Sequence, residues 1–150
     1  MLEDKVQETD IDLQNQANSR INEFISDLTN VNWYITLFND SGDIETCDFI
    51  AYQFHFDLAG TVTATSSLDV REGYWVAEMD SDGEIDLILS FDLNGSDDNF
   101  EDLIDDWDVV TTSTSLIELM DVSGGNGSTD LLTFGVIPID CLSSTEDTID

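Results

Sequence analysis

Residues 45–65 read ETCDFIAYQFHFDLAGTVTAT, and this stretch decides the expected fold. Side chains alternate between the two faces of an extended chain. The apolar residues of its first half recur at every second position: Tyr52, Phe54, Phe56 and Leu58. After a turn at Ala59 and Gly60, threonines alternate with Val62 and Ala64. The pattern predicts the central hairpin of an antiparallel sheet whose buried face is aromatic.

Eight stretches of strand character follow one another along the chain, and this hairpin contributes two of them. They cover residues 32–38, 48–58, 61–66, 70–79, 85–92, 108–113, 115–121 and 131–134. Most are separated by short turns rich in Asn, Asp and Gly, which adopt the positive φ angles that hairpin turns require. Short strands joined in this way predict a mainly β fold, an eight-stranded antiparallel up-and-down barrel.

Two helices are expected beside the barrel. Apolar residues recur at helical spacing through residues 10–29 and predict an amphipathic helix that packs on, or plugs, one end of the barrel. Residues 1–8 are expected to form a solvated arm. A short helix is predicted before the sixth strand, with Ser96 or Asp97 as its cap. Its apolar face would consist of Phe100, Leu103, Ile104 and Trp107.

Composition limits the classes of partner. A chain of 150 residues suits one domain with a substantial core. Its 34 acidic residues against three basic ones give a formal net charge of -31, which repels nucleic acid and anionic membrane surfaces. Hydrophobic residues make up 41% of the chain and favour a packed globule over disorder. No apolar run approaches the roughly 20 residues of a transmembrane helix, so no such segment is expected.

Spaced motifs along the chain combine into a pattern typical of one family. They are Trp33 with Phe38, Thr46 with Phe49, Tyr52, Phe54 and Phe56, Gly60-Thr61-Val62-Thr63-Ala64, Gly73-Tyr74-Trp75, Phe100 with Leu103, Asp106-Trp107, Asp121-Val122-Ser123-Gly124-Gly125-Asn126-Gly127 and Leu132-Thr133-Phe134. This combination resembles the lipocalin-like domains of secreted bacterial lipoproteins. The resemblance implies a small calycin-type barrel that is exported and commonly lipid-anchored, hence a secreted, periplasmic or outer-membrane-surface location.

The resemblance covers residues 31–135, the expected lipocalin-like barrel. The chain is therefore divided into an N-terminal arm and helix (residues 1–30), this barrel (31–135) and a C-terminal tail (136–150). The first functional hypothesis is an extracytoplasmic binding module that holds a small apolar or amphipathic ligand inside the barrel. Its candidate ligand-binding residues are Trp33, Ile35, Leu37, Tyr52, Phe54, Phe56, Trp75, Leu87, Leu89 and Phe91. The alternative is a structural or interaction domain of a cell-surface lipoprotein, with a filled core and no ligand. A monomer without a cofactor is expected in both cases.

Three motifs invite a chemical interpretation. Residues 78–86 match part of an EF-hand calcium loop, but Leu89 replaces its bidentate glutamate, so a hairpin turn is preferred and no metal site is assigned. His55, the single histidine, falls on the outward face without an evident nucleophile or orienting acid, so neither a catalytic residue nor an enzyme is predicted. The glycine-rich residues 124–127 resemble a phosphate loop in composition alone and are expected to form a turn.

Cys47 and Cys141 are the only cysteines, and they lie too far apart in sequence for a CxxC motif. Two interpretations remain open. They are either unrelated small core residues or a disulfide formed in an oxidising compartment. A disulfide would close a loop of about 95 residues and stabilise the fold by roughly 4 kcal/mol through the unfolded state.

Overall fold

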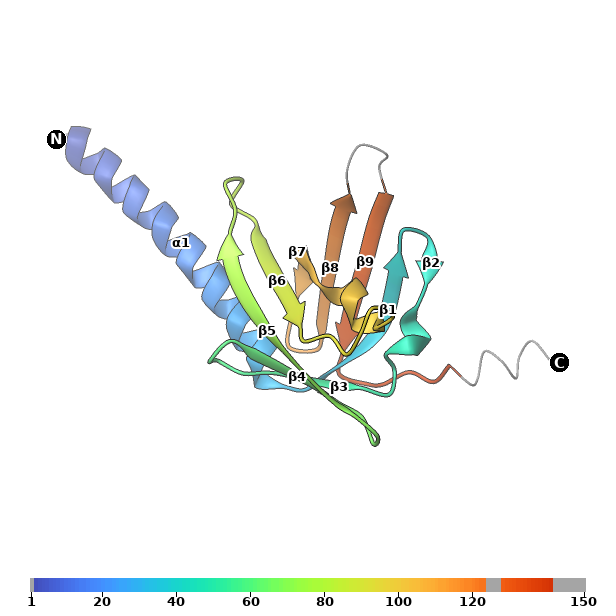
Figure 1. The fold of residues 1–150 in the computed structure, drawn as a ribbon. Helices are drawn as coiled ribbons and strands as arrows, with labels where there is room; N and C mark the ends of the chain where they lie inside the picture. Colours follow the sequence, from blue (N-terminus) through green and yellow to red (C-terminus); the bar gives the residue numbers. More distant parts are fainter. Residues whose placement is uncertain (1, 124–127, 142–150) are drawn as a thin grey trace.

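The computed structural model describes residues 2–123 and 128–141 as one antiparallel sheet preceded by a long helix (Figure 1). The helix α1 spans Leu2–Asn30, and two 3-10 helices follow, η1 (Thr46–Asp48) and η2 (Asn99–Leu103). The strands within the described residues are β1 (Trp33–Asp40), β2 (Asp43–Ile44), β3 (Gln53–Phe56), β4 (Thr61–Thr65), β5 (Val70–Met79), β6 (Ile85–Phe91), β7 (Asp105–Thr112), β8 (Leu116–Ser123) and β9 (Ser128–Gly135).

The sheet closes on itself because β1 pairs with both β3 and β9. Every pairing is antiparallel, and each strand from β3 to β8 pairs with the next strand along the chain. The strand β2 only extends β1 by a short hairpin, so the barrel itself has eight strands. The fold class predicted from the sequence, an eight-stranded antiparallel up-and-down barrel, is confirmed.

A bulge in β1 changes which of its side chains face inward. The register between β1 and β9 shifts between Ile35 and Leu37, so β1 carries one extra residue at this point. An extra residue moves every following side chain to the opposite face of the sheet. Phe38 is therefore fully buried, whereas Leu37 is only half-buried. The inward position predicted for Leu37 is wrong for this reason.

The strand predicted over residues 48–58 is much shorter in the structure. The chain first forms η1 and then pairs as β3 over four residues only. It turns immediately afterwards, because the Asp57 carboxylate accepts hydrogen bonds from the N–H groups of Ala59 (2.9 Å) and Thr61 (3.2 Å). Leu58 lies in this turn and is 77% exposed. Its predicted place on the apolar face is therefore wrong.

The helix α1 begins at Leu2, so the arm expected over residues 1–8 is helical from Leu2 onward. Its C-terminal half packs on the barrel, where Phe24 and Leu28 are fully buried within the core. Trp33 Nε1 donates a hydrogen bond to the Leu28 carbonyl oxygen at 2.9 Å and links the helix end to β1. The N-terminal half of α1 extends away from the barrel in Figure 1.

The short helix predicted before the sixth strand of the barrel is η2, a 3-10 helix of five residues. Its N-cap is Asp98 rather than Ser96 or Asp97, because Asp98 Oδ1 accepts a hydrogen bond from the Phe100 N–H at 3.1 Å. Phe100 is buried as expected. Trp107 is also buried, but it belongs to β7, so the helix ends earlier than predicted.

Aromatic rings in mutual contact occupy the barrel interior. Phe54 lies edge-on to Phe91 and Phe134, at centroid distances of 6.2 and 5.4 Å. Phe56 lies edge-on to Phe134 at 5.8 Å and to Trp75 at 6.4 Å. Edge-to-face pairs at such distances are favourable beyond the apolar area that they bury. The interior is therefore a packed core that side chains from several strands build together.

Candidate functional site

The ten predicted ligand-binding residues belong mostly to this packed core. Eight of them are buried: Trp33, Ile35, Phe54, Phe56, Trp75, Leu87, Leu89 and Phe91. The other two are half-buried, Leu37 because of the bulge and Tyr52 because it faces a surface groove. Tyr52 Oη donates a hydrogen bond to the Asp69 carboxylate at 2.9 Å. Its hydroxyl therefore makes a polar contact at the surface and does not line an apolar cavity.

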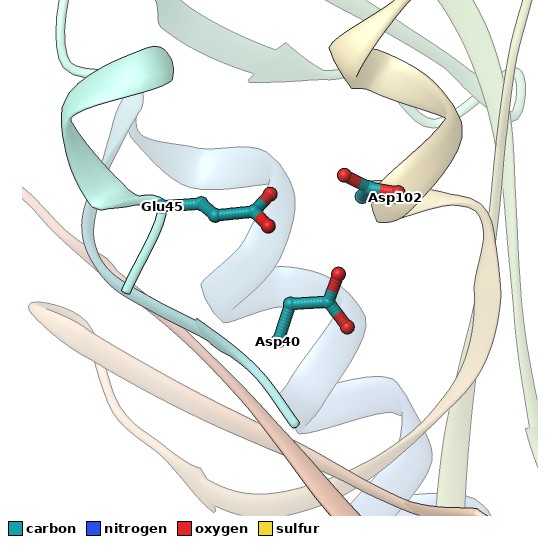
Figure 2. Close-up of side chains that lie close together, drawn as sticks. All are labelled: Asp40, Glu45 and Asp102. Atoms are coloured by element: carbon teal, nitrogen blue, oxygen red, sulfur yellow. The ribbon is translucent and has the colours of Figure 1, made fainter. Parts of the chain in front are cut away.

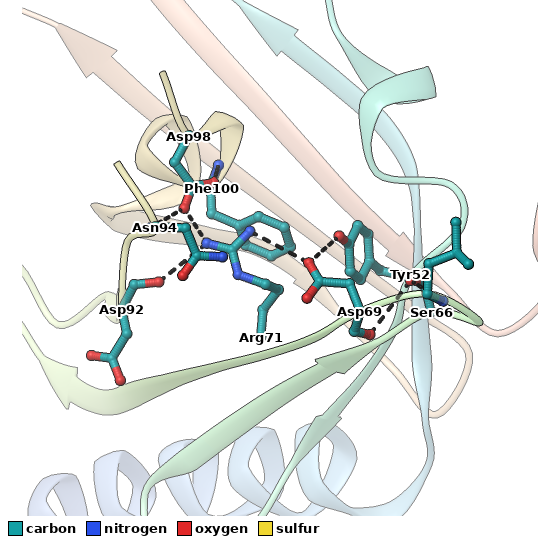
Figure 3. A network of polar contacts seen from close by, with 9 residues as sticks. Tyr52, Ser66, Asp69, Arg71, Asp92, Asn94, Asp98 and Phe100 are labelled. Atoms are coloured by element: carbon teal, nitrogen blue, oxygen red, sulfur yellow. Dashed lines mark hydrogen bonds and ion pairs between the residues drawn. The ribbon is translucent and has the colours of Figure 1, made fainter. Parts of the chain in front are cut away.

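Arg71 is a buried cation in a strongly acidic protein. It shares the inward face of β5 with Gly73 and Trp75 and is only 6% exposed. Its Nη2 atom donates to the Asp98 carboxylate and to the main-chain oxygen of Asp92, the latter at 3.2 Å (Figure 3). A buried charge is tolerated when it is paired and hydrogen-bonded. These two acceptors therefore account for the inward position of Arg71.

Two further contacts complete the surroundings of Arg71. Its guanidinium carbon lies 4.3 Å from the ring centroid of Phe100, which is a cation–π arrangement. Asp69 Oδ2 lies 3.9 Å from Arg71 Nη1 and also accepts the Tyr52 hydrogen bond. Burial and this hydrogen bond to Asp69 raise the pKa of Tyr52, so its hydroxyl stays protonated.

Asp98 connects Arg71 to the loop that precedes η2. Its Oδ2 atom accepts a hydrogen bond from the Asn94 N–H at 2.8 Å, and its Oδ1 atom accepts one from the Phe100 N–H. Burial by itself would raise the pKa of Asp98, but Arg71 and these two N–H groups lower it below its ordinary value. Asp98 and Arg71 are thus both charged, and they hold the loop against β5.

A surface groove of about 500 Å³ opens beside this network. We call it the Arg71 groove, and six of its lining residues define it: Asp48, Tyr52, Arg71, Asn94, Asp97 and Asp98. They come from η1, the segment before β3, the start of β5 and the loop before η2. Folding thus brings three separate chain segments, residues 48–52, Arg71 and residues 94–98, into one polar site, which contrasts with the apolar interior.

A second groove, of about 400 Å³, lies between α1 and the barrel and is lined in part by Arg20, Glu23, Ile85 and Val110. Arg20 Nη2 donates a hydrogen bond across it to the Gly83 carbonyl oxygen at 2.8 Å. This contact ties α1 to the turn between β5 and β6. This second groove is therefore the boundary along which α1 packs against the barrel.

Carboxylates from distant segments also gather. Figure 2 shows Asp40, Glu45 and Asp102, whose carboxylate oxygens lie within 4.8 Å of one another. Burial raises the pKa of Glu45 to about 7, assisted by hydrogen bonding to Asp102 and by the charges of Asp102 and Asp40. Close like charges favour the protonated form, so this group of carboxyls binds protons near neutral pH.

Two further carboxylate triads have the same character: Asp80, Asp86 and Asp108, and Asp105, Asp121 and Asp130. Burial, followed by hydrogen bonding to Asp108, raises the pKa of Asp86 to about 6. Hydrogen bonding to Asp105, followed by burial, raises the pKa of Asp121 to about 7. Carboxylate oxygens suit hard cations such as Ca²⁺. Protons shared between the carboxyl groups explain the close approach of their oxygens equally well.

The acidic stretch that partly matches a calcium loop is a hairpin turn between β5 and β6. Asp80 Oδ1 accepts hydrogen bonds from the N–H groups of Asp82 (2.8 Å) and Glu84 (3.0 Å). Gly83 has a φ of +82°, which glycine adopts without strain. The predicted hairpin turn is therefore confirmed.

The remaining motifs have plain outcomes. His55 is exposed, as its outward position predicted, and its Nδ1 atom lies 2.9 Å from Asn32 Oδ1. The glycine-rich residues 124–127 lie outside the described residues. Cys47 and Cys141 form a disulfide with their Cα atoms 5.8 Å apart, so this alternative holds. The bond joins the segment after β9 to η1, next to the groove residue Asp48.

Sequence reasoning missed the pairing of Arg71 with Asp98. One signal was available: in residues 70–79 Arg71 has the same alternation as Trp75, so a charged residue falls on an inward position and requires a carboxylate partner. No local pattern identifies the partner, because Asp98 lies on a different element and is one of 34 acidic residues.

Comparisons with known proteins address the fold alone. No protein-family model and no curated protein matches the chain. The structure is similar to the crystal structure of a DUF4847 family protein from Bacteroides vulgatus ATCC 8482, with a TM-score of 0.50 and 12% sequence identity. The match covers 75% of this chain and 96% of that chain. Among the described residues, no helix combines the length and the apolarity that crossing a membrane requires.

Proposed function

We propose that the chain is a lipocalin-like domain of an exported bacterial protein, and that it acts as an interaction domain with a filled core. The observation that carries this proposal is the continuous set of ring contacts inside the barrel. The function would then lie on the surface of the domain, and its core would only provide stability.

The space inside the barrel favours this proposal over transport of an apolar ligand. An eight-stranded barrel is just wide enough to be filled by its own side chains or to hold one small ligand. Phe54, Phe91 and Phe134 meet inside it, and Phe24 and Leu28 of α1 join the same core. A ligand would have to displace these rings and forfeit their packing.

The Cys47–Cys141 disulfide supports an extracytoplasmic location. Disulfides persist mainly in secreted, periplasmic and cell-surface proteins, because the cytosol keeps thiols reduced. We therefore infer that the domain is secreted, periplasmic or held at the outer-membrane surface. It acts as a monomer, without a catalytic residue or a cofactor.

Titration of the purified protein with a fluorescent fatty acid tests the proposal. We expect no saturable fluorescence change with the wild type, because rings already occupy the interior. Phe54→Ala should open a cavity that admits at most a benzene-sized molecule, so this variant should not take up the fatty acid either. Val76→Ala, at an exposed position of β5, is the matched control and should behave as the wild type.

The opposite pattern would favour the rival hypothesis of a binding module. This pattern is saturable uptake by the wild type at one site, lost in Phe54→Ala and retained in Val76→Ala. Native mass spectrometry provides a second measurement, because a barrel that carries a ligand should retain one through purification.

A further inference from the structure

We propose that the Arg71 groove is the docking site for a basic side chain, Lys or Arg, presented by an extended segment of a partner protein. The inference rests on the proposed function, since it names the class of partner for the interaction domain. It is carried by a groove of about 500 Å³ whose walls are fixed and whose unpaired charges are negative.

The walls of the groove are held in place by bonds within the domain. Asp98 accepts hydrogen bonds from the Asn94 and Phe100 N–H groups and from the guanidinium of Arg71. The disulfide at Cys47 anchors the segment that carries Asp48. A preformed site binds with a smaller loss of conformational entropy than a mobile one. The groove is therefore ready to receive a ligand.

The charge available to a ligand in the groove is negative. Asp69 and Asp98 together more than neutralise the single charge of Arg71. Asp48 and Asp97 are exposed, and within the described residues no basic side chain lies within ion-pair distance of either. An anionic ligand would meet these carboxylates while Arg71 is already engaged. The complementary ligand is therefore a cation.

The other groups in the groove suit a peptide rather than a bare metal ion. None of the three carboxylate triads among the described residues lies in it. Asn94, Ser96 and Asn99 contribute neutral hydrogen-bonding groups that can pair with the backbone of a bound segment. The ring of Tyr52, which is half-buried and lines the groove, can contact the aliphatic stem of Lys or Arg.

An NMR titration of the full chain tests the proposal. The probe is a capped pentapeptide, Gly-Ser-Arg-Ser-Gly, at moderate salt, and the control peptide carries citrulline in place of arginine. The arginine peptide should cause saturable shifts in the amide signals of Asn94 and Ser96. The citrulline peptide, which keeps the shape and loses the charge, should not.

Two double variants with the same change in net charge separate the groove from the general acidity of the protein. Asp48→Asn/Asp97→Asn should weaken binding of the arginine peptide by at least about fivefold. Glu72→Gln/Glu78→Gln removes two charges from exposed positions of β5 and should change the affinity by less than about twofold. Melting curves of both variants show whether they remain folded.

Three outcomes would overturn the groove as a docking site: no saturable shift with the arginine peptide, shifts spread evenly over the acidic surface, or equal losses in the two double variants. The contrast between the two peptides on the wild type decides the question even if a variant fails to fold. The fatty-acid titration is independent of these results, so failure of this inference is distinguishable from failure of the filled-core proposal.

Discussion

Phe54 in the barrel interior and Arg71 in the groove both occupy inward positions of strands, yet different forces hold them. Phe54 makes ring contacts with several partners, and the loss of any one partner leaves the others. Arg71 depends on directional hydrogen bonds to Asp98 and to the main-chain oxygen of Asp92. The opposite charges of Arg71 and Asp98 offset the cost of burying each of them. Apolar packing is non-directional and should tolerate changes that conserve volume, whereas a charged pair should not tolerate the loss of one member.

Truncation of the core should have the largest effect and tests the apolar side of this comparison. Phe54→Ala should lower the free energy of unfolding by about 3 to 5 kcal/mol, because transfer and cavity terms add. Phe54→Leu should cost clearly less, since it keeps most of the apolar volume. Denaturant unfolding measures both values. Equal losses for the two variants would contradict the idea of a packing-dominated interior.

Loss of one charge at the groove should come next. Arg71→Met should lower the free energy of unfolding by about 3 kcal/mol, because the Asp98 carboxylate is then buried without its cation. Arg71→Met combined with Asp98→Leu should recover much of this loss, which a double-mutant cycle measures. Arg20→Met, at an exposed position of α1, is the control and should cost less than about 1 kcal/mol. Strictly additive effects would contradict the pairing.

The smallest effect should be a change of folding stability with pH. It arises from titration of the carboxylate triads, because, among the described residues, the apolar interior carries no titrating group of this kind. The folded-state pKa values of Glu45, Asp86 and Asp121 are raised to about 7, 6 and 7, above the values of free carboxyls. The folded protein therefore binds these protons more tightly than the unfolded chain does. Stability should rise as the pH falls from 8 towards 5 and be lost as the pH rises through 6 to 7.

Thermal melting at several pH values measures this dependence, and Glu45→Gln should reduce it because the variant lacks one titrating group. Asp98 acts in the opposite direction, since its pKa is lowered: its contribution to stability is present above the ordinary carboxyl pKa of about 4 and is lost at lower pH. A melting temperature that falls steadily from pH 8 to 5 would contradict the shared protons.

Strands with uninterrupted alternation were predictable from local sequence. The stretch predicted over residues 70–79 coincides with β5, and the one over 85–92 ends one residue after β6. Both have inward residues at every second position, apolar apart from Arg71, and this period reflects the geometry of an extended chain. Prediction was less accurate where a single residue breaks the period, as in the β1 bulge before Leu37, because an insertion of this kind leaves no mark in composition.

The sequence by itself determined the mainly β class, the eight strands of the barrel and its apolar face, because these depend on contacts between near neighbours and on a period of two. Only the tertiary structure decided which distant segments meet. Asp98 reaches Arg71, Cys141 reaches Cys47, and Asp102 reaches Glu45, each from a different segment of the chain. Such pairs depend on the paths of loops and, for the disulfide, on the pairing of β1 with β9, and a chain with 34 acidic residues offers many equivalent partners until the fold selects one.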